Sequence, residues 1–587
     1  MGEAHPLDAI IENGLFFDGS GKRAGVTANV GIRDGRVAII DPGPLERGPS
    51  TRVYDARGQW VMPGFIDLHT HYDAEVEVAP GLPESVRHGV TTVLLGSCSL
   101  SLAVGTPQDL ADMFCRVEAI PDEVVRPLLE ANKTWSTHGE YFRHLAELAL
   151  GPNVVSFVGH SAIRAHVMGI ERSLEKDVVP EERELVAMEA LLEDALDEGY
   201  LGLSIQTLPW DKMGGDRPFR SRPLPSTFAR YSEYRRLARI LRRRGRIFQG
   251  VPNVSTKWNV IFFLLESVGL LRRTLKTTVI SLMDLRKQRW LRPIIGAVSR
   301  LFNTVLDADF RWQALPEPFD LWADGVDLVV FEEFGAGAAA LHYRKHEDRV
   351  KLFADPAYRA RFKQQWTSRF LPKVFHRDFN LAEVLACPDA SLVGRTFADI
   401  ARERGKDAVD TFLDLVSEHG TALRWYTVMA NDRVAPLQAV VSHPDVLIGF
   451  SDAGAHLRNM AHYNFPLRML RLVNEAARRG EPFMPLERAV WRLTGELGDW
   501  LGIDAGHLEV GSRADVVVVD PAGLTEQVDE TAEAPIPGFG GFVRLVRRND
   551  SAVSLVLVAG HEAVKDGVPA ARLGTEPMGT VLRTRVE

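Results

Sequence analysis

The stretch PGFIDLHTH, residues 63–71, decides the expected fold. It is a short apolar run that ends in two histidines one residue apart. In an extended segment, residues i and i+2 point to the same side, so His69 and His71 are expected to face one point. Such a pair can hold one divalent ion through imidazole nitrogens. Alone, the pair is more often a surface feature, so further ligands must come from other segments.

Apolar, β-branched runs like this one recur along the chain, separated by helical stretches. They occupy residues 91–98, 153–160, 201–208, 245–253, 277–284, 424–432 and 446–456. Continuous apolar runs are typical of parallel strands buried on both faces, and eight of them predict an α/β fold, a (β/α)8 TIM-like barrel. The interval between the runs at residues 277–284 and 424–432 is too long for one crossover helix. It predicts a helical insertion at about residues 285–420.

The two ends of the chain have a different sequence pattern. Short segments in which apolar and polar residues alternate are separated there by turn residues. Asn13-Gly14 and Asp34-Gly35 are dipeptides that favour hairpin turns. Similar runs return at residues 506–521 and 554–567. We therefore expect residues 1–61 and 505–587 to form one small β-sandwich around a barrel domain at residues 62–504.

Composition narrows the class of partner. The chain has 587 residues, 45% of them hydrophobic, and a formal net charge of -9. This charge argues against a general attraction to nucleic acid or to anionic lipid, because both need a basic face. A small-molecule partner is expected. Three cysteines and a start without a secretory pattern predict a cytoplasmic protein.

Membrane association is not expected from hydropathy. The chain has no run of the roughly 18 to 20 apolar residues that crossing a bilayer requires. The nearest is WNVIFFLLESVGLL, residues 258–271, which polar residues interrupt. It predicts an amphipathic helix, packed into the core or lying over a substrate entrance or a lipid surface.

Polar residues at strand ends carry the most weight, because barrel active sites lie at the C-terminal ends of the strands. Cys98 ends the second run, where its thiolate can bind a metal, although a lone cysteine is more often a small hydrophobe. Asp452 follows the last run, where a carboxylate can bind metal and accept a proton from water, or simply form a turn. His160 ends the third run and can orient a carbonyl or pack in the core.

Taken together, these features resemble the amidohydrolase superfamily, and more narrowly its N-acyl-D-amino-acid deacylases, the D-aminoacylase-like branch. The resemblance rests on six motifs in the family's order: VMPGFIDLHTHYD (61–73), ESVRHGVTTVLLGSCSLSLA (84–103), NVVSFVGHSAIRAHVMG (153–169), EGYLGLSIQTL (198–208), LIGFSDAGAH (447–456) and LEVGSRADVVVVDP (508–521). It implies a metal-dependent hydrolase of an amide, with an N-acyl amino acid as substrate. Within it, His69 and His71 match the first metal pair, Cys98 the cysteine ligand, and Asp452 the ligand that is also general base.

The chain departs from the family at the fifth and sixth strands, where the deacylases place metal-binding histidines. Those ends read FQGVPN (248–253) and SLMDLR (281–286), and no histidine occurs between His166 and His342. The departure predicts one tightly held zinc per chain, at the histidine pair and Asp452, with Cys98 as a further ligand.

Substrate contacts are expected near the missing histidines and in one loop. Gln249 and Asn253 can hydrogen-bond a substrate amide or a water. The loop PWDKMGGDRPFRSRPLP, residues 209–225, is expected to bring Arg220 near the mouth of the barrel. There the two parallel N–H groups of its guanidinium can bind a carboxylate, although such loops are more often simply solvated.

Two other functions stay open at this point, as does the formation of a homo-oligomer. The first is a metal-dependent lyase or decarboxylase, because a fold does not determine a reaction. The second is a non-catalytic binding protein that has lost its metal site together with the histidines.

Overall fold

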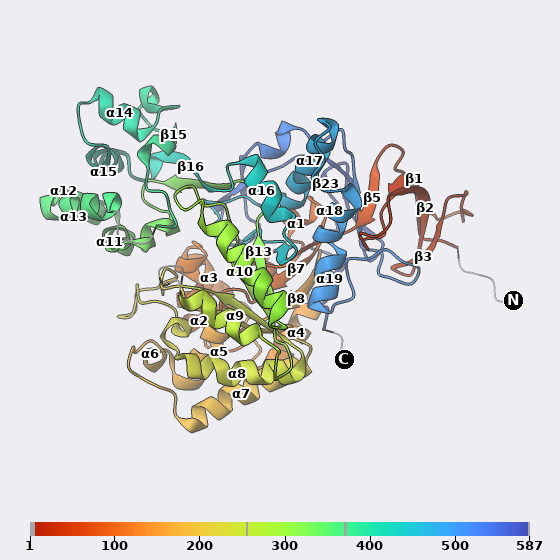
Figure 1. Ribbon diagram of the computed structural model, residues 1–587, viewed down its shortest axis with the longest axis horizontal. Helices are drawn as coiled ribbons and strands as arrows, with labels where there is room; N and C mark the ends of the chain where they lie inside the picture. The colour runs from red at the N-terminus through yellow and green to blue at the C-terminus, as the bar shows by residue number, and fades with distance from the viewer. Residues whose placement is uncertain (1–5, 254–255, 257, 369–372, 585–587) are drawn as a thin grey trace.

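The computed structural model describes residues 6–253, 256, 258–368 and 373–584 and has a mixed α/β fold. Figure 1 shows a central body of strands and helices, a sheet at the right that contains the first strands of the chain, and a separate lobe at the upper left. Among the described residues, no helix has the length and apolar character needed to cross a membrane.

The central strands pair in parallel and in sequence order. One set contains β6 (Phe65–Asp67), β7 (Val90–Leu95) and β8 (Asn153–Ser156). The other contains β9 (Val158–Gly159), β10 (Gly202–Gln206), β11 (Ile247–Val251), β12 (Lys276–Val279), β13 (Asp309–Ala314) and β17 (Val446–Ile448). Only Phe157 separates β8 from β9, and beyond β6 the Leu68 N–H donates to the Gly449 carbonyl at 3.0 Å. The two sets are thus joined at both ends.

Helices between and after these strands cover the outside of the central body (Figure 1). The main ones are α2 (Pro107–Val117), α3 (Asp122–Asn132), α4 (His138–Glu147), α5 (His160–Met168), α7 (Glu182–Asp197), α8 (Tyr231–Arg244), α9 (Trp258–Ser267), α10 (Leu291–Val305), α16 (Val434–Val441), α17 (Phe465–Arg478), α18 (Leu486–Leu493) and α19 (Gly495–Leu501). Strands β6, β7, β10 and β11 are buried along their whole length, as expected of parallel strands that are covered on both faces.

The prediction that residues 424–432 form a barrel strand is wrong. This segment contains β16 (Arg424–Ala430), which pairs antiparallel with β14 (Phe319–Asp324) and β15 (Glu383–Ala386). The strand between β12 and β17 is instead β13. Its sequence, DFRWQA, mixes charged and aromatic residues, so it lacks the continuous apolar run on which the prediction relied.

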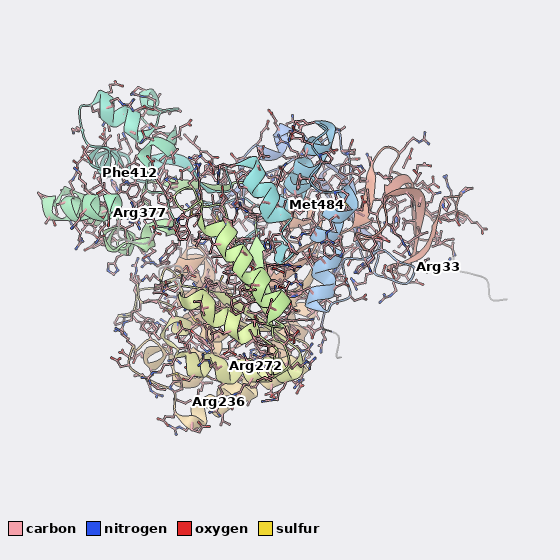
Figure 2. All side chains as sticks on the ribbon, viewed as in Figure 1. Arg33, Arg236, Arg272, Arg377, Phe412 and Met484 are labelled. Atoms are coloured by element: carbon pink, nitrogen blue, oxygen red, sulfur yellow. The ribbon has the colours of Figure 1, made fainter. Side chains whose placement is uncertain are left out.

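The insertion consequently begins after β13 and not at residue 285, because α10 is a crossover helix between β12 and β13. The insertion is also not purely helical. It combines β14, β15 and β16 with α11 (Gly335–His342), α12 (His346–Ala354), α13 (Pro356–Thr367), α14 (Phe397–Glu403) and α15 (Ala408–His419). Its helices form the lobe of Figure 1, in which Figure 2 labels Arg377 and Phe412. Packed aromatic rings, among them Phe331, Phe412 and Trp425, make its core.

Both ends of the chain contribute strands to one sheet. It contains β1 (Ala9–Phe16), β2 (Val26–Arg33), β3 (Arg36–Asp41), β4 (Arg52–Asp55), β5 (Trp60–Pro63), β18 (Val516–Val519), β21 (Val553–Val558), β22 (His561–Lys565) and β23 (Val568–Pro569). The ends meet where β5 pairs antiparallel with β18. Asp34 and Gly35 connect β2 to β3 as a tight turn, whereas Asn13 lies in a bulge within β1, so that part of the hairpin prediction is wrong. The domain boundaries at residues 61 and 505 stay predictions.

Candidate metal centre and its cleft

His69 and His71 lie directly after β6, and both are buried. In each ring a second buried residue engages Nδ1. His69 Nδ1 lies 2.6 Å from Gln313 Oε1, and His71 Nδ1 lies 2.9 Å from Glu118 Oε1. Partners of this kind set the ring orientation and the tautomer of metal-binding histidines. Both rings thereby turn Nε2 toward a common point.

Cys98 and Asp452 meet the histidines at that point. Cys98 Sγ lies 3.2 Å from His69 Nε2, and Asp452 Oδ1 lies 3.2 Å from His71 Nε2 and 3.7 Å from His69 Nε2. The two histidines and the cysteine each offer a ligand atom within 4.8 Å of one another. The structure therefore brings together all four predicted metal residues, and imidazole, thiolate and carboxylate are the donors that zinc prefers.

The backbone is strained at this centre. Cys98, Asp452 and His456 have φ values of 52°, 58° and 47°, in the left-handed region. Non-glycine residues seldom adopt this region, and each costs about 1–3 kcal/mol, which persists mainly at functional sites. His456 Nε2 lies 3.9 Å from Asp452 Oδ2. The loop after β17 thus holds the carboxylate against the histidines.

Acidic groups crowd the centre, which suits a cation. Burial first, and then neighbouring negative charge that includes Glu118, raises the pKa of Asp73 and of Asp211 to about 7. Burial alone would raise the pKa of Asp452, but the hydrogen bond and charge of His71 hold it well below its usual range. Burial lowers the pKa of His69 to about 4, so this ring is neutral at pH 7 and ready to bind a metal.

The pKa of His71 behaves oppositely. Burial alone would lower it, but Glu118, Cys98 and Asp452 together raise it well above its usual value. The positive charge of a protonated His71 offsets the negative charge of these acidic neighbours. A divalent ion can replace that proton, because metal binding releases protons from its ligands.

The predicted substrate residues near β11 lie in different surroundings. Gln249 is buried, and its amide nitrogen lies 3.5 Å from Ser97 Oγ, next to Cys98. Its Oε1 has no hydrogen-bond partner among the described residues. Asn253 is half-buried just beyond β11, and its backbone N–H donates to Thr207 Oγ1 at 3.0 Å. Gln249 therefore has a free acceptor close to the centre.

His160 differs from Gln249 because both of its ring nitrogens lie next to side chains of the protein. Its ring is fully buried at the start of α5. Nδ1 lies 3.0 Å from Ser226 Oγ and Nε2 lies 3.0 Å from Glu233 Oε1. Both ring nitrogens thus face side chains inside the protein, and the role of His160 as a substrate contact stays a prediction.

A cleft of about 530 Å³ adjoins the centre and is lined by His456, Asp211 and Arg220 among other residues. Arg220 is 20% exposed, and its nearest carboxylate, Asp216, lies 3.9 Å away. Its Nε is buried and has no hydrogen-bond partner among the described residues. Burial and the charges of Arg344 and Arg116 lower the pKa of Arg220, so an anion bound beside Arg220 would be favoured there.

Four residues of the centre and cleft escaped the sequence analysis: Glu118, Asp211, Gln313 and His456. His456 was detectable, because it stands four residues after Asp452 within the motif GFSDAGAH. Gln313 lies in the strand that was not recognised, and Glu118 follows α2 without any motif.

Glu118 supplies a test of this arrangement. We expect Glu118→Gln to weaken zinc binding by about 10- to 100-fold, because outer partners of ligand histidines contribute that much. Competition with a chelating dye measures the affinity. Glu130→Gln, an exposed change on α3, is the matched control. Equal affinity in both variants would show that Glu118 does not support His71.

Comparisons with known proteins agree with this geometry. No family model matches the chain. An uncharacterized protein of Mycobacterium tuberculosis is 48% identical over 569 residues, 96% of this chain and 93% of that protein. The D-aminoacylase of Alcaligenes xylosoxydans xylosoxydans is 27% identical over 532 residues, 89% of this chain and 90% of that enzyme.

Among solved structures, the N-acyl-D-glutamate deacylase of Bordetella bronchiseptica, in complex with zinc and a phosphonate inhibitor, has the same fold. The TM-score is 0.63 at 22% identity, and the match covers 99% of this chain and 100% of that one. The similarity to relatives extends over nearly the whole length, including the insertion and both ends. The chain therefore belongs to one family with the mycobacterial protein, and over nearly its whole length it is similar to the D-aminoacylases and shares their fold.

Proposed function

We propose that this enzyme hydrolyses the amide bond of an N-acylated amino acid at a centre with one zinc ion. The observation that carries the proposal is the group of His69, His71 and Cys98, together with Asp452 Oδ1, which lies against Nε2 of both histidines. We also propose that the central strands close into a (β/α)8 barrel. The sequential parallel pairings and the contacts between the ends of β6 and β17 support it.

The protein residues divide the chemistry between them. His69 and His71, with Asp452, would hold the ion, which when bound activates water and polarises a carbonyl. Asp452 is ionised and 14% exposed, so it can meet a water that enters from the cleft. It accepts the proton of the attacking water and passes it to the amide nitrogen as the C–N bond breaks, giving an amine and a carboxylate.

The cleft supports an acyl amino acid as the substrate. Arg220 would bind the carboxylate with its guanidinium fork. Gln249 Oε1, free of partners among the described residues, can accept the substrate amide N–H, and Asn253 is the second candidate for this contact. D-aminoacylase and N-acyl-D-glutamate deacylase among the relatives support this class by their names.

A product assay tests the function. The purified enzyme would be incubated with N-acyl-D- and N-acyl-L-amino acids in the presence of zinc, cobalt or manganese. Equimolar free amino acid and carboxylic acid support hydrolysis. Carbon dioxide or an unsaturated product would show a decarboxylase or a lyase. No turnover of any substrate, together with a chain reproducibly free of divalent metal, would show a binding protein.

Arg220→Gln tests the carboxylate contact. We expect KM for an N-acyl amino acid to rise by about 10- to 100-fold with little change in kcat, because a hydrogen bond to a charged group contributes roughly 1.5–3 kcal/mol. Arg222→Gln in the same loop is the control, since Arg222 pairs with Glu175 at 2.9 Å. A substrate amide that lacks the carboxylate should be hydrolysed equally by wild type and variant. A matching loss on that neutral substrate would contradict the assignment.

A further inference from the structure

Helix α10 carries apolar side chains on both of its sides. Toward the protein it buries Gly296 and Ser299, and Leu291, Ile295 and Phe302 pack against the core while partly buried. Its solvent side is apolar, with Trp290 and Ile294 each 51% exposed, Leu301 54% and Val305 60%. Spacings of three and four residues place these side chains on one face of the helix. A helix of a monomeric protein normally presents a polar face to water, so this face is built for contact.

Helix α9 extends the same apolar surface. Phe262 and Phe263 point into the core, yet Ile261 and Leu265 remain exposed on the other side, followed by Leu270 and Leu271. Helices α9 and α10 both pack on β13 and lie beside each other in Figure 1. Their ends are joined by the Gly269 N–H, which donates to the Asp307 carbonyl at 2.8 Å. We call this surface the α9–α10 face: Ile261, Leu265, Leu270, Leu271, Trp290, Ile294, Val298, Leu301 and Val305.

Basic residues surround the α9–α10 face. Residues 230–300 contain 17 lysines and arginines and three acidic residues. Many of these arginines pair with carboxylates, and Arg236, Arg243 and Arg244 do so with acidic residues of α7. Exposed arginines occur in the neighbouring segments: Arg239 on α8, Arg272 and Arg273 after α9, and Arg289 before α10. Figure 2 labels Arg272, which lies 2.6 Å from the Leu265 carbonyl at the end of α9.

We propose that the α9–α10 face docks on an anionic lipid surface. Apolar side chains, a tryptophan and a basic surround are the combination that holds a helix in the interface of such a membrane. A second copy of the chain fits less well, because a two-fold contact would bring the same arginines face to face. The sequence prediction against anionic lipid relied on the total charge, which does not show where exposed arginines such as Arg239 and Arg289 stand.

Sedimentation of the full-length protein with vesicles tests the proposal. We expect binding to phosphatidylcholine vesicles that contain phosphatidylglycerol, weak binding to phosphatidylcholine alone, and release by high salt. Two variants remove the two contributions separately. Ile294→Glu with Leu301→Glu and, in a second protein, Arg239→Glu with Arg289→Glu should each lower the bound fraction at least about tenfold. Val510→Glu, an exposed apolar position outside the face, should bind like wild type.

Thermal unfolding checks separately that each variant folds. All the substituted side chains are exposed, so we expect the variants to unfold like wild type. Equal binding to neutral and anionic vesicles would overturn the proposal, and so would variants that unfold like wild type and bind like it. Light scattering gives a third outcome. A dimer that Ile294→Glu with Leu301→Glu dissociates, in a protein that ignores vesicles, would assign the face to a second copy instead.

Discussion

Asp452→Asn is expected to reduce turnover by several powers of ten. The change keeps the shape of the side chain but removes the charge that accepts the proton. Assistance by a general base alone contributes roughly 10²- to 10⁴-fold to a rate, and loss of a metal ligand adds to this. The structure puts the carboxylate 3.2 Å from His71 Nε2 and ionised, which the proposed step requires. Release of free amino acid from the best N-acyl substrate measures kcat and kcat/KM.

The control for this variant is Asp348→Asn, which makes the same chemical change at a carboxylate paired with Lys351 in the insertion. It should leave turnover unchanged. Metal content is measured on the same samples, because a slow enzyme that still holds its metal has lost the proton acceptor and not the ion. Turnover within tenfold of wild type would show that Asp452 is not the general base.

The centre was largely predictable because its ligands stand in short local patterns. The His-x-His pair, the cysteine after a buried run and the aspartate after another run each follow a strand, and parallel strands bring their C-terminal ends together. The structure indeed places Cys98 Sγ 3.2 Å and Asp452 Oδ1 3.7 Å from His69 Nε2. The partners that orient the rings were not predictable. Glu118 reaches His71 only through the packing of the segment after α2, which no local pattern encodes.

The errors in the fold have one physical origin. A pattern of apolar residues shows that a strand is buried, but not what it pairs with. The segment around β16 is apolar enough for a barrel strand, yet its partners are β14 and β15 in the insertion. Strand β13 is a member of the central sheet although Arg311 interrupts its apolar residues, because that side chain turns outward and pairs with Asp309 at 3.2 Å. Interchanging these two segments moved the predicted start of the insertion.

His69→Ala combined with His71→Ala is expected to remove bound zinc and all measurable activity. Wild type should hold one ion per chain, counted by elemental analysis of the purified protein. The pair supplies two of the nitrogen donors, and the sequence offers no histidine between His166 and His342 to replace them. His346→Ala, at the start of α12 in the insertion, is the control and should retain the metal.

Cys98→Ser separates two positions for that ion. If the ion sits with the histidine pair and Asp452, Cys98→Ser should weaken zinc retention less than the histidine variant does, since three protein ligands remain and suffice for a catalytic zinc. A position anchored by the cysteine would need imidazoles from the ends of β11 and β12, where this chain has Gln249 and Ser281. Two ions per chain would contradict the single-ion centre. So would loss of all metal in Cys98→Ser with full retention in Asp452→Asn, which would place the ion at the cysteine.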